Sequence, residues 1–233
     1  MTAPRSAPKH QRVVGVIASH ADLDNALRMR NRPDFFELRL DRLTDTVDQL
    51  ENNLPRLRAP LIITARHPRE GGANKLSVRQ RRDLLTRFLP HADYIDVELR
   101  SASALLSLLT LARHKKVRSI ISFHNFKSTP LPSVLVAKAR AAKACGANIF
   151  KIATRTDTPI ELTHLLDFIT RKNVNLPIAA MGIGKLGAIS RILLAHAGSA
   201  LVYASIGTAT DIEGQLSLEQ LRTLGIGRMT KLK

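Results

Sequence analysis

Cysteine and aromatic residues are scarce in this sequence, and their scarcity excludes several classes of protein. Among the 233 residues there is one cysteine, Cys145, no tryptophan and an aromatic content of only 4%. A single cysteine rules out an intrachain disulfide and a cysteine-based zinc site. So few aromatic rings also supply poorly the stacking platforms on which proteins bind single-stranded nucleic acid.

Long hydrophobic runs are absent as well. The first apolar stretch, Val13 to Ala18, has six residues and leads directly into a polar segment, so it is too short for a cleavable signal. No run approaches the roughly 18 apolar residues that a membrane-spanning helix needs. We therefore expect a cytoplasmic protein, in which the basic, proline-containing residues 1–12 form a flexible arm.

Acidic residues are few beside the basic ones. Lysine and arginine number 36 and aspartate and glutamate 19, so the formal net charge is +17. Such a charge attracts nucleic acid, an anionic membrane surface or a small acidic substrate. The net charge alone does not indicate which of these three is the partner. The densest basic cluster falls in a helical pattern, and we expect a solvated helix face for its members Arg79, Arg81, Arg82 and Arg87.

Short β-branched apolar runs alternate eight times with amphipathic stretches, which predicts eight strands that are each followed by a helix. The expected strands are Val13–Ala18, Phe35–Leu40, Leu61–Ala65, Tyr94–Leu99, Ser119–Phe123, Ile149–Ala153, Ile178–Met181 and Leu201–Ile206. The clearest helices are Ser103–His114, Pro132–Ala144, Pro159–Arg171 and Lys185–Ala197. Eight such units favour one α/β domain, a closed (β/α)8 TIM barrel over residues 13–233, rather than an open doubly wound sheet. Active sites of such barrels lie at the C-terminal ends of the strands.

Charged residues at the ends of the second and third strands are therefore candidate active-site residues. Glu37, Arg39 and Asp41 share one side by the two-residue strand period, and that side would face into the barrel. The third strand ends near Arg66 and continues into a loop that carries Glu70. The structural alternative is a buried ion-pair network that ties strands together, since a barrel interior tolerates charge only when it is paired.

The fifth and sixth strands contribute His124 and Lys151. Lys151 is hard to explain structurally, because a barrel has no strand edge from which a lysine reaches solvent. Buried among apolar groups and cationic neighbours, Lys151 would be neutral and able to attack a ketone. We expect His124 at the same level of the neighbouring strand, where an imidazole can move protons, although a lone buried histidine is more often structural.

Gly182, Gly184 and Gly187 follow the seventh strand with the G-x-G-x-x-G spacing of dinucleotide-binding turns. The match is weak, because no acidic residue ends the next strand as that fold requires. Glycine turns after the seventh strand of a barrel also form anion sites. Arg191, on the following helix, could reach back to an anion held there.

Six motifs in order along the chain resemble those of type I 3-dehydroquinate dehydratases. They are Glu37-Leu38-Arg39-Leu40-Asp41, Arg66 with Glu70-Gly71-Gly72, Ser122-Phe123-His124-Asn125-Phe126, Phe150-Lys151-Ile152-Ala153, Met181-Gly182 with Ser190-Arg191, and Gly214-Gln215-Leu216-Ser217. The resemblance extends from Val13 to Leu224 and implies a barrel without cofactor or metal that is usually a homodimer. It also implies the dehydration of 3-dehydroquinate to 3-dehydroshikimate in the shikimate pathway to aromatic amino acids.

The resemblance implies roles for individual residues. Lys151 matches the lysine that forms a Schiff base with the substrate ketone. His124 matches the general base that later protonates the leaving hydroxyl, and Glu70 matches the carboxylate that orients this histidine. The positions that match substrate-binding residues are Glu37, Arg39 and Arg66 at the hydroxyls, Arg191 at the carboxylate and Gln215 in the closing loop.

Two positions depart from the family pattern. The closing loop, commonly Ser-Ala-Pro-Gly-Gln, reads Asp211-Ile212-Glu213-Gly214-Gln215 here, and Gly15 stands where many members carry a serine. Asp211 would lie near the substrate carboxylate and repel it unless a cation such as Arg191 lies between them.

Two alternatives stay open at this point. A lysine on the sixth strand would equally serve another Schiff-base barrel lyase, such as an aldolase, although His124, Glu70 and the anion site at Arg191 favour the dehydratase. The non-enzymatic alternative is an inactive basic barrel that binds nucleic acid, although we expect neither a specific nucleic acid nor a membrane as a partner.

Overall fold

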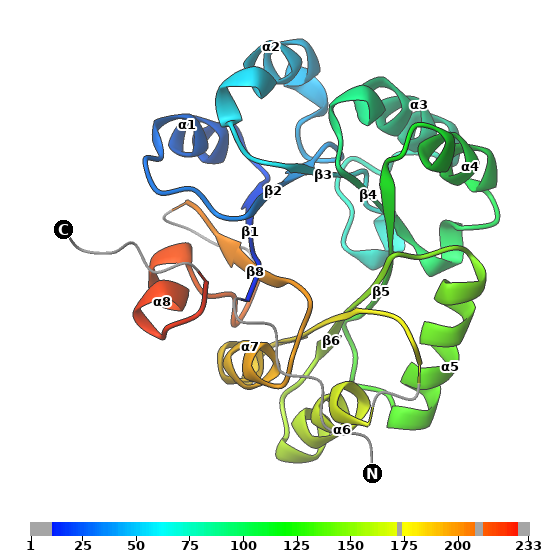
Figure 1. The fold of residues 1–233 in the computed structure, drawn as a ribbon, viewed down its shortest axis with the longest axis vertical. Coiled ribbons are helices and arrows are strands. Elements are labelled where there is room, and N and C mark those ends of the chain that lie inside the picture. Colours follow the sequence, from blue (N-terminus) through cyan, green and yellow to red (C-terminus); the bar gives the residue numbers. More distant parts are fainter. Residues whose placement is uncertain (1–10, 172–173, 208–211, 228–233) are drawn as a thin grey trace.

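The chain folds as a (β/α)8 barrel in a computed structural model that describes residues 11–171, 174–207 and 212–227. Within these ranges eight parallel strands form one sheet in the order β7-β6-β5-β4-β3-β2-β1-β8, with the helices outside it (Figure 1). A backbone hydrogen bond of 2.7 Å from Ala200 to the carbonyl of Ile178 joins the two ends of this order. The predicted fold class is confirmed.

The strands begin within one residue of their predicted starts. They are β1 Val13–Ile17, β2 Phe35–Arg39, β3 Leu61–Thr64, β4 Tyr94–Glu98, β5 Arg118–Asn125, β6 Ile149–Arg155, β7 Ile178–Ile183 and β8 Val202–Ser205. The helices are α1 His20–Arg28, α2 Val47–Leu57, α3 Val78–Phe88, α4 Leu106–His114, α5 Pro132–Ala144, α6 Pro159–Thr170, α7 Gly187–His196 and α8 Leu218–Thr223. In the described part of the chain no helix has the length and apolar character needed to cross a membrane.

Local signals in the sequence explain where several helices begin. Thr158 and Glu161 form a capping box at α6, with a proline in its first turn, and Ser217 and Gln220 form the predicted box at α8. Gly146, just after α5, has a φ of +82°, a conformation that favours glycine where the chain turns back into β6.

The barrel interior is layered by the two-residue period of its strands. The lower layer is apolar, and its members include Val14, Phe35, Ile62, Tyr94, Ile120, Ile149 and Tyr203. Two residues further along strands β2 to β6, the inward residues are Glu37, Thr64, Asp96, Ser122 and Lys151, each no more than 4% exposed. The apolar layer therefore forms a floor beneath a polar layer at the C-terminal half of the barrel.

One expectation about the helices is wrong. Arg79, Arg82 and Arg87 of α3 are solvated, but Arg81 is completely buried. Its guanidinium donates to the carbonyl of Ala65 and to Ser101 Oγ, and it forms an ion pair with Glu98. The helical pattern predicts the helix but not these partners, which lie on other segments of the chain.

Candidate active site

One cavity of about 180 Å³ opens above the polar layer. Every predicted site residue that lies in the described ranges lines it, namely Glu37, Arg39, Arg66, Glu70, His124, Lys151, Arg191 and Gln215. Asp211, the remaining predicted residue, lies outside the described residues, as do residues 1–10 of the predicted arm. The strand ends have thus brought together residues that are up to 178 positions apart, from Glu37 to Gln215.

Lys151 lies at the centre of the polar layer with two carboxylates against its ammonium group. Its Nζ donates to Glu37 Oε1 and to Asp96 Oδ2, each at 3.1 Å, and lies 3.9 Å from the centre of the Tyr203 ring. The expectation of mainly apolar and cationic neighbours is wrong, because the inward residues of β2 and β4 are acidic. The two carboxylates and the Tyr203 ring thus fix the position of Nζ in the polar layer.

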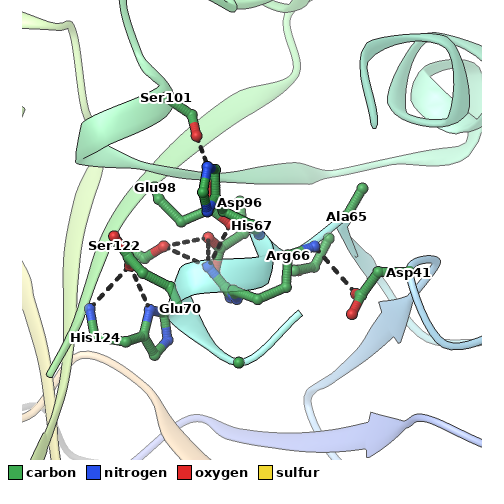
Figure 2. Close-up of polar contacts among 12 residues, drawn as sticks. Asp41, Ala65, Arg66, His67, Glu70, Asp96, Glu98, Ser101, Ser122 and His124 are labelled. Atoms are coloured by element: carbon green, nitrogen blue, oxygen red, sulfur yellow. Dashed lines mark hydrogen bonds and ion pairs between the residues drawn. The ribbon is translucent and has the colours of Figure 1, made fainter. Parts of the chain in front are cut away.

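Asp96 also binds Arg66, which follows β3 (Figure 2). Asp96 therefore connects Lys151 to Arg66. Both guanidinium NH2 groups of Arg66 donate to Asp96 at 2.9 Å, and Ser122 Oγ donates to the same carboxylate at 2.6 Å. Burial opposes the ionised form, but Arg66 and Lys151 together lower the pKa of Asp96 far below its ordinary value. Asp96 is therefore a fixed negative charge that holds two cations in place.

Glu98 is, after Asp96, the second carboxylate of β4 that the sequence analysis did not identify. Its Oε1 accepts from Arg66 Nη1 at 3.2 Å and from the backbone N–H of His67 at 2.9 Å, while its Oε2 pairs with Arg81. The signal was present in the sequence, because Asp96 and Glu98 alternate with apolar residues on β4 as Glu37 and Arg39 do on β2.

His124 and Glu70 form a pair at the rim of the cavity (Figure 2). Glu70 Oε2 lies 3.0 Å from the ring Nδ1 of His124 and 3.0 Å from its backbone nitrogen. His124 pairs with Ala153 across the ladder, whereas Lys151 pairs with Ser122. The expectation that His124 and Lys151 share a level is therefore wrong, since the imidazole is one layer nearer the mouth of the barrel.

The surroundings of this pair favour a neutral imidazole. Burial, with Arg66 and Lys151 nearby, lowers the pKa of His124 well below its ordinary value. Burial and the charge of Glu98 raise the pKa of Glu70 to about 7. When Glu70 is ionised it accepts the Nδ1 proton of His124, which leaves Nε2 able to accept a proton from a group in the cavity.

Arg39 and Asp41 form the outer part of the predicted ion-pair network. Arg39 Nε and Nη2 donate to the two Asp41 oxygens at 3.0 and 2.9 Å. Although burial opposes it, the pKa of Asp41 is lowered by the hydrogen bond and the charge of Arg39. Arg66 Nη2 lies 3.7 Å from Glu37 Oε1. The structural alternative and the functional one are compatible here, because Glu37, Arg39 and Arg66 also line the cavity.

Arg191 is a buried cation of a different kind. It is 3% exposed, and among the described residues it donates only to backbone carbonyls, those of Gly214 at 3.1 Å and Tyr203 at 3.2 Å. No carboxylate of the described residues lies within ion-pair distance, and burial alone lowers its pKa to about 10. A buried arginine that lines a cavity and has no carboxylate partner among the described residues is suited to an anionic ligand.

The glycines at the end of β7 and in the turn after it allow close packing at this wall of the cavity. A side chain on Gly182 would come within 2.5 Å of Ser190 Oγ, and one on Gly187 would meet the backbone of Gly214. Glu213 is bound by Arg155 Nη2 at 3.2 Å and accepts from the backbone of Gly184 at 3.1 Å. Residues 212–215 are thus held against the turn, with Ile212 and Gln215 at the cavity.

Comparisons of the sequence and of the structure with known proteins relate this chain to one enzyme family. The family model for type I 3-dehydroquinase matches residues 13–225. A 3-dehydroquinate dehydratase of Geobacillus sp. (strain WCH70) is 33% identical over 83% of this chain and 79% of its own length. One from Pyrococcus abyssi is 34% identical over 84% and 89% of the two chains. The crystal structure of the 3-dehydroquinate dehydratase from Geobacillus kaustophilus superposes with a TM-score of 0.83 at 26% identity, covering 93% of this chain and 90% of that one.

Proposed function

The chain belongs to the type I 3-dehydroquinase family and is a hydro-lyase that converts 3-dehydroquinate to 3-dehydroshikimate and water, and we propose that it does so through a Schiff base on Lys151. The observation that carries this proposal is the placement of Lys151, the His124–Glu70 pair and Arg191, which has no carboxylate partner among the described residues, around one cavity. An amine, a proton-transfer group and an anion site are the three parts that dehydration of a β-hydroxy-keto acid requires.

The first step is the attack of Lys151 on the ring ketone. The ammonium gives up a proton, and the amine nitrogen forms a bond with the carbonyl carbon; loss of the ketone oxygen as water leaves a protonated imine. Glu37, whose Oε1 lies 3.1 Å from Nζ, is the acceptor for the departing proton and returns it to the leaving oxygen, while Asp96, also 3.1 Å from Nζ, stays ionised. The same carboxylates then lie beside the iminium cation and stabilise it.

The next steps move a proton from carbon to the departing hydroxyl. His124 removes the proton from the carbon adjacent to the imine, and the electrons of that bond move into the iminium to give an enamine. The enamine expels the β-hydroxyl, which leaves as water with a proton from His124. Hydrolysis of the remaining imine releases 3-dehydroshikimate and restores Lys151. Glu70 keeps the imidazole oriented and is a positioning residue.

Binding of the substrate falls to the charged groups around the ring. Arg191 holds the carboxylate, because it lines the cavity, is 3% exposed and has no carboxylate partner among the described residues. Glu37, Arg39 and Arg66 bind the hydroxyls, and Gln215 approaches the ring from the segment 212–215. A position for Asp211 near the substrate carboxylate stays a prediction, as do assembly into a homodimer and a cytoplasmic location.

An aldolase-like reaction would also use Lys151. It has no need of a carbon-acid base held by a carboxylate at 3.0 Å together with a separate buried anion site, and these two features favour dehydration. The test is the absorbance of the enone product when the purified chain is given 3-dehydroquinate. Turnover that Lys151→Met abolishes supports the proposal, whereas turnover that survives this substitution contradicts it.

A further inference from the structure

A second cavity lies at the opposite end of the barrel from the catalytic one. It has a volume of about 280 Å³ and lies between the end of α4, the start of β5 and the loop before β6. Its lining includes Arg113, Lys116, Arg118 and Asn148, and none of its lining residues is acidic. The established reaction, at the C-terminal ends of the strands, makes no use of it.

The three cations of this cavity differ from those exposed arginines that are paired with a nearby carboxylate. Arg28 pairs with Asp24, and Arg171 with Asp167, each four positions earlier in the chain. Among the described residues no carboxylate lies within 4.0 Å of a charged nitrogen of Arg113, Lys116 or Arg118. Three positive charges that share one cavity repel one another, and an anion bound between them would remove this repulsion.

One of the cations is held in position by a neighbouring ring. Arg118 stacks on Tyr94, with its guanidinium carbon 4.1 Å from the ring centre. This contact reduces the side-chain entropy that a bound anion would otherwise have to remove. Arg113 Nη2 lies beside Gly146, where a Cβ would be 2.3 Å from it.

The amide of Asn148 leaves a donor for a ligand, whereas the hydroxyl proton of Ser119 is already used. Asn148 Oδ1 already accepts from the backbone of Ser119 at 2.8 Å, so the NH2 end of this amide is the part that a ligand can use. Ser119 Oγ donates to the carbonyl of Gly146 at 3.0 Å. An oxyanion with several acceptor oxygens is complementary to this arrangement.

From these contacts we propose that the cavity is a binding site for a small oxyanion of the phosphate class, separate from the catalytic site. The ligand is either free phosphate or the phosphate group of a small ester, since both present the same acceptor oxygens. The guanidinium groups of Arg113 and Arg118 bind these oxygens, while Lys116 contributes charge.

The test is isothermal titration calorimetry of the full chain with inorganic phosphate and with phenyl phosphate, at constant ionic strength. Arg113→Met/Arg118→Met removes two charges from the cavity, and Arg28→Met/Arg171→Met removes two from elsewhere. We expect the first variant to bind phosphate at least about tenfold more weakly and the second to bind it as the wild type does. Tighter binding of either probe supports the site and identifies the source of the anion.

Turnover of 3-dehydroquinate by both double variants separates this proposal from the catalytic one. Binding at Arg191 would appear as competitive inhibition by phosphate, equal in all three proteins. Equal phosphate affinity in the two double variants, or the absence of binding outside the catalytic cavity in the wild type, would overturn the second site.

Discussion

Two buried arginines provide a matched test of which charges serve binding and which serve stability. Arg81 is completely buried and paired with Glu98, while Arg191 is 3% exposed and, within the described ranges, hydrogen-bonded to carbonyls alone. Methionine preserves much of the length of either side chain and removes the charge. The substitutions Arg81→Met and Arg191→Met therefore compare two equally buried guanidinium groups with different partners.

The expected magnitudes follow from those partners. Breaking a buried ion pair costs about 3–5 kcal/mol of stability, and we expect Arg81→Met to lose this much. For Arg191 the fall of the pKa from 12.5 to about 10 corresponds to a cost of about 3 kcal/mol for burying the charge. That cost is present throughout the physiological pH range, because the group stays protonated below the lowered pKa. Its removal offsets the loss of the two carbonyl hydrogen bonds, which contribute a similar amount.

Substrate binding should show the opposite order. Loss of a buried, hydrogen-bonded partner of the substrate carboxylate costs about 2–5 kcal/mol, which raises KM by about 30- to 4,000-fold. The assay is urea unfolding of both variants beside KM and kcat for 3-dehydroquinate. We expect Arg81→Met to lose stability with KM within about tenfold of the wild type, and Arg191→Met to lose affinity with little change in stability. An unchanged KM in Arg191→Met, or a loss of stability as large as that of Arg81→Met, would refute the assignment of Arg191 to the substrate carboxylate.

The remaining predictions concern proton transfer and charge. His124→Ala should still form the imine, seen by borohydride trapping, but turn over about 10²- to 10⁴-fold more slowly, and near-normal turnover would remove His124 from the mechanism. The kcat/KM of the wild type should fall below pH 7, where Glu70, with a pKa of about 7, becomes protonated and no longer accepts the Nδ1 proton; Glu70→Gln should move this fall to lower pH, and an unmoved profile would contradict the coupling. Because the pKa of Glu70 is raised from 4.5 to about 7, the folded state binds this proton more tightly than the unfolded state does. The contribution of Glu70 to folding stability should therefore decline as the pH rises from 4.5 to about 7, and Glu70→Gln should remove this decline in thermal unfolding. If the net charge of +17 steers the anionic substrate, kcat/KM should fall as salt rises while kcat stays constant, and a salt-insensitive kcat/KM would exclude steering.

Most of the fold was predictable because its signals are local. Apolar runs and helix caps define each βα unit, and the strand starts differ by no more than one residue from the prediction. The ends were harder to place. β5 and β6 continue to Asn125 and Arg155, past their apolar runs, because the ladder pairs His124 with Ala153 and Asn125 with Thr154. The predicted helix at Ser103 begins at Leu106, after a turn.

Several of the residues that line the cavity were predictable from the sequence, but their contacts were not. The order of the motifs along the chain predicted that Lys151, His124 and Glu70 would share one cavity. It did not predict which carboxylates contact Lys151, because these come from strands that are distant in sequence. Asp96 was readable from its alternation on β4 and was missed. The burial of Arg81 was not readable, because its partners belong to other segments and a helical pattern with charge on several sides does not identify the buried one.

The central claim is that Lys151 forms a covalent bond with the substrate. The most direct measurement is borohydride reduction of the chain in the presence of 3-dehydroquinate, followed by proteolysis and mass spectrometry. The account predicts one substrate-derived adduct on Lys151, absent without borohydride and absent from Lys151→Met. Unlabelled Lys151 in a preparation that turns over 3-dehydroquinate, or an adduct on another lysine, would contradict it.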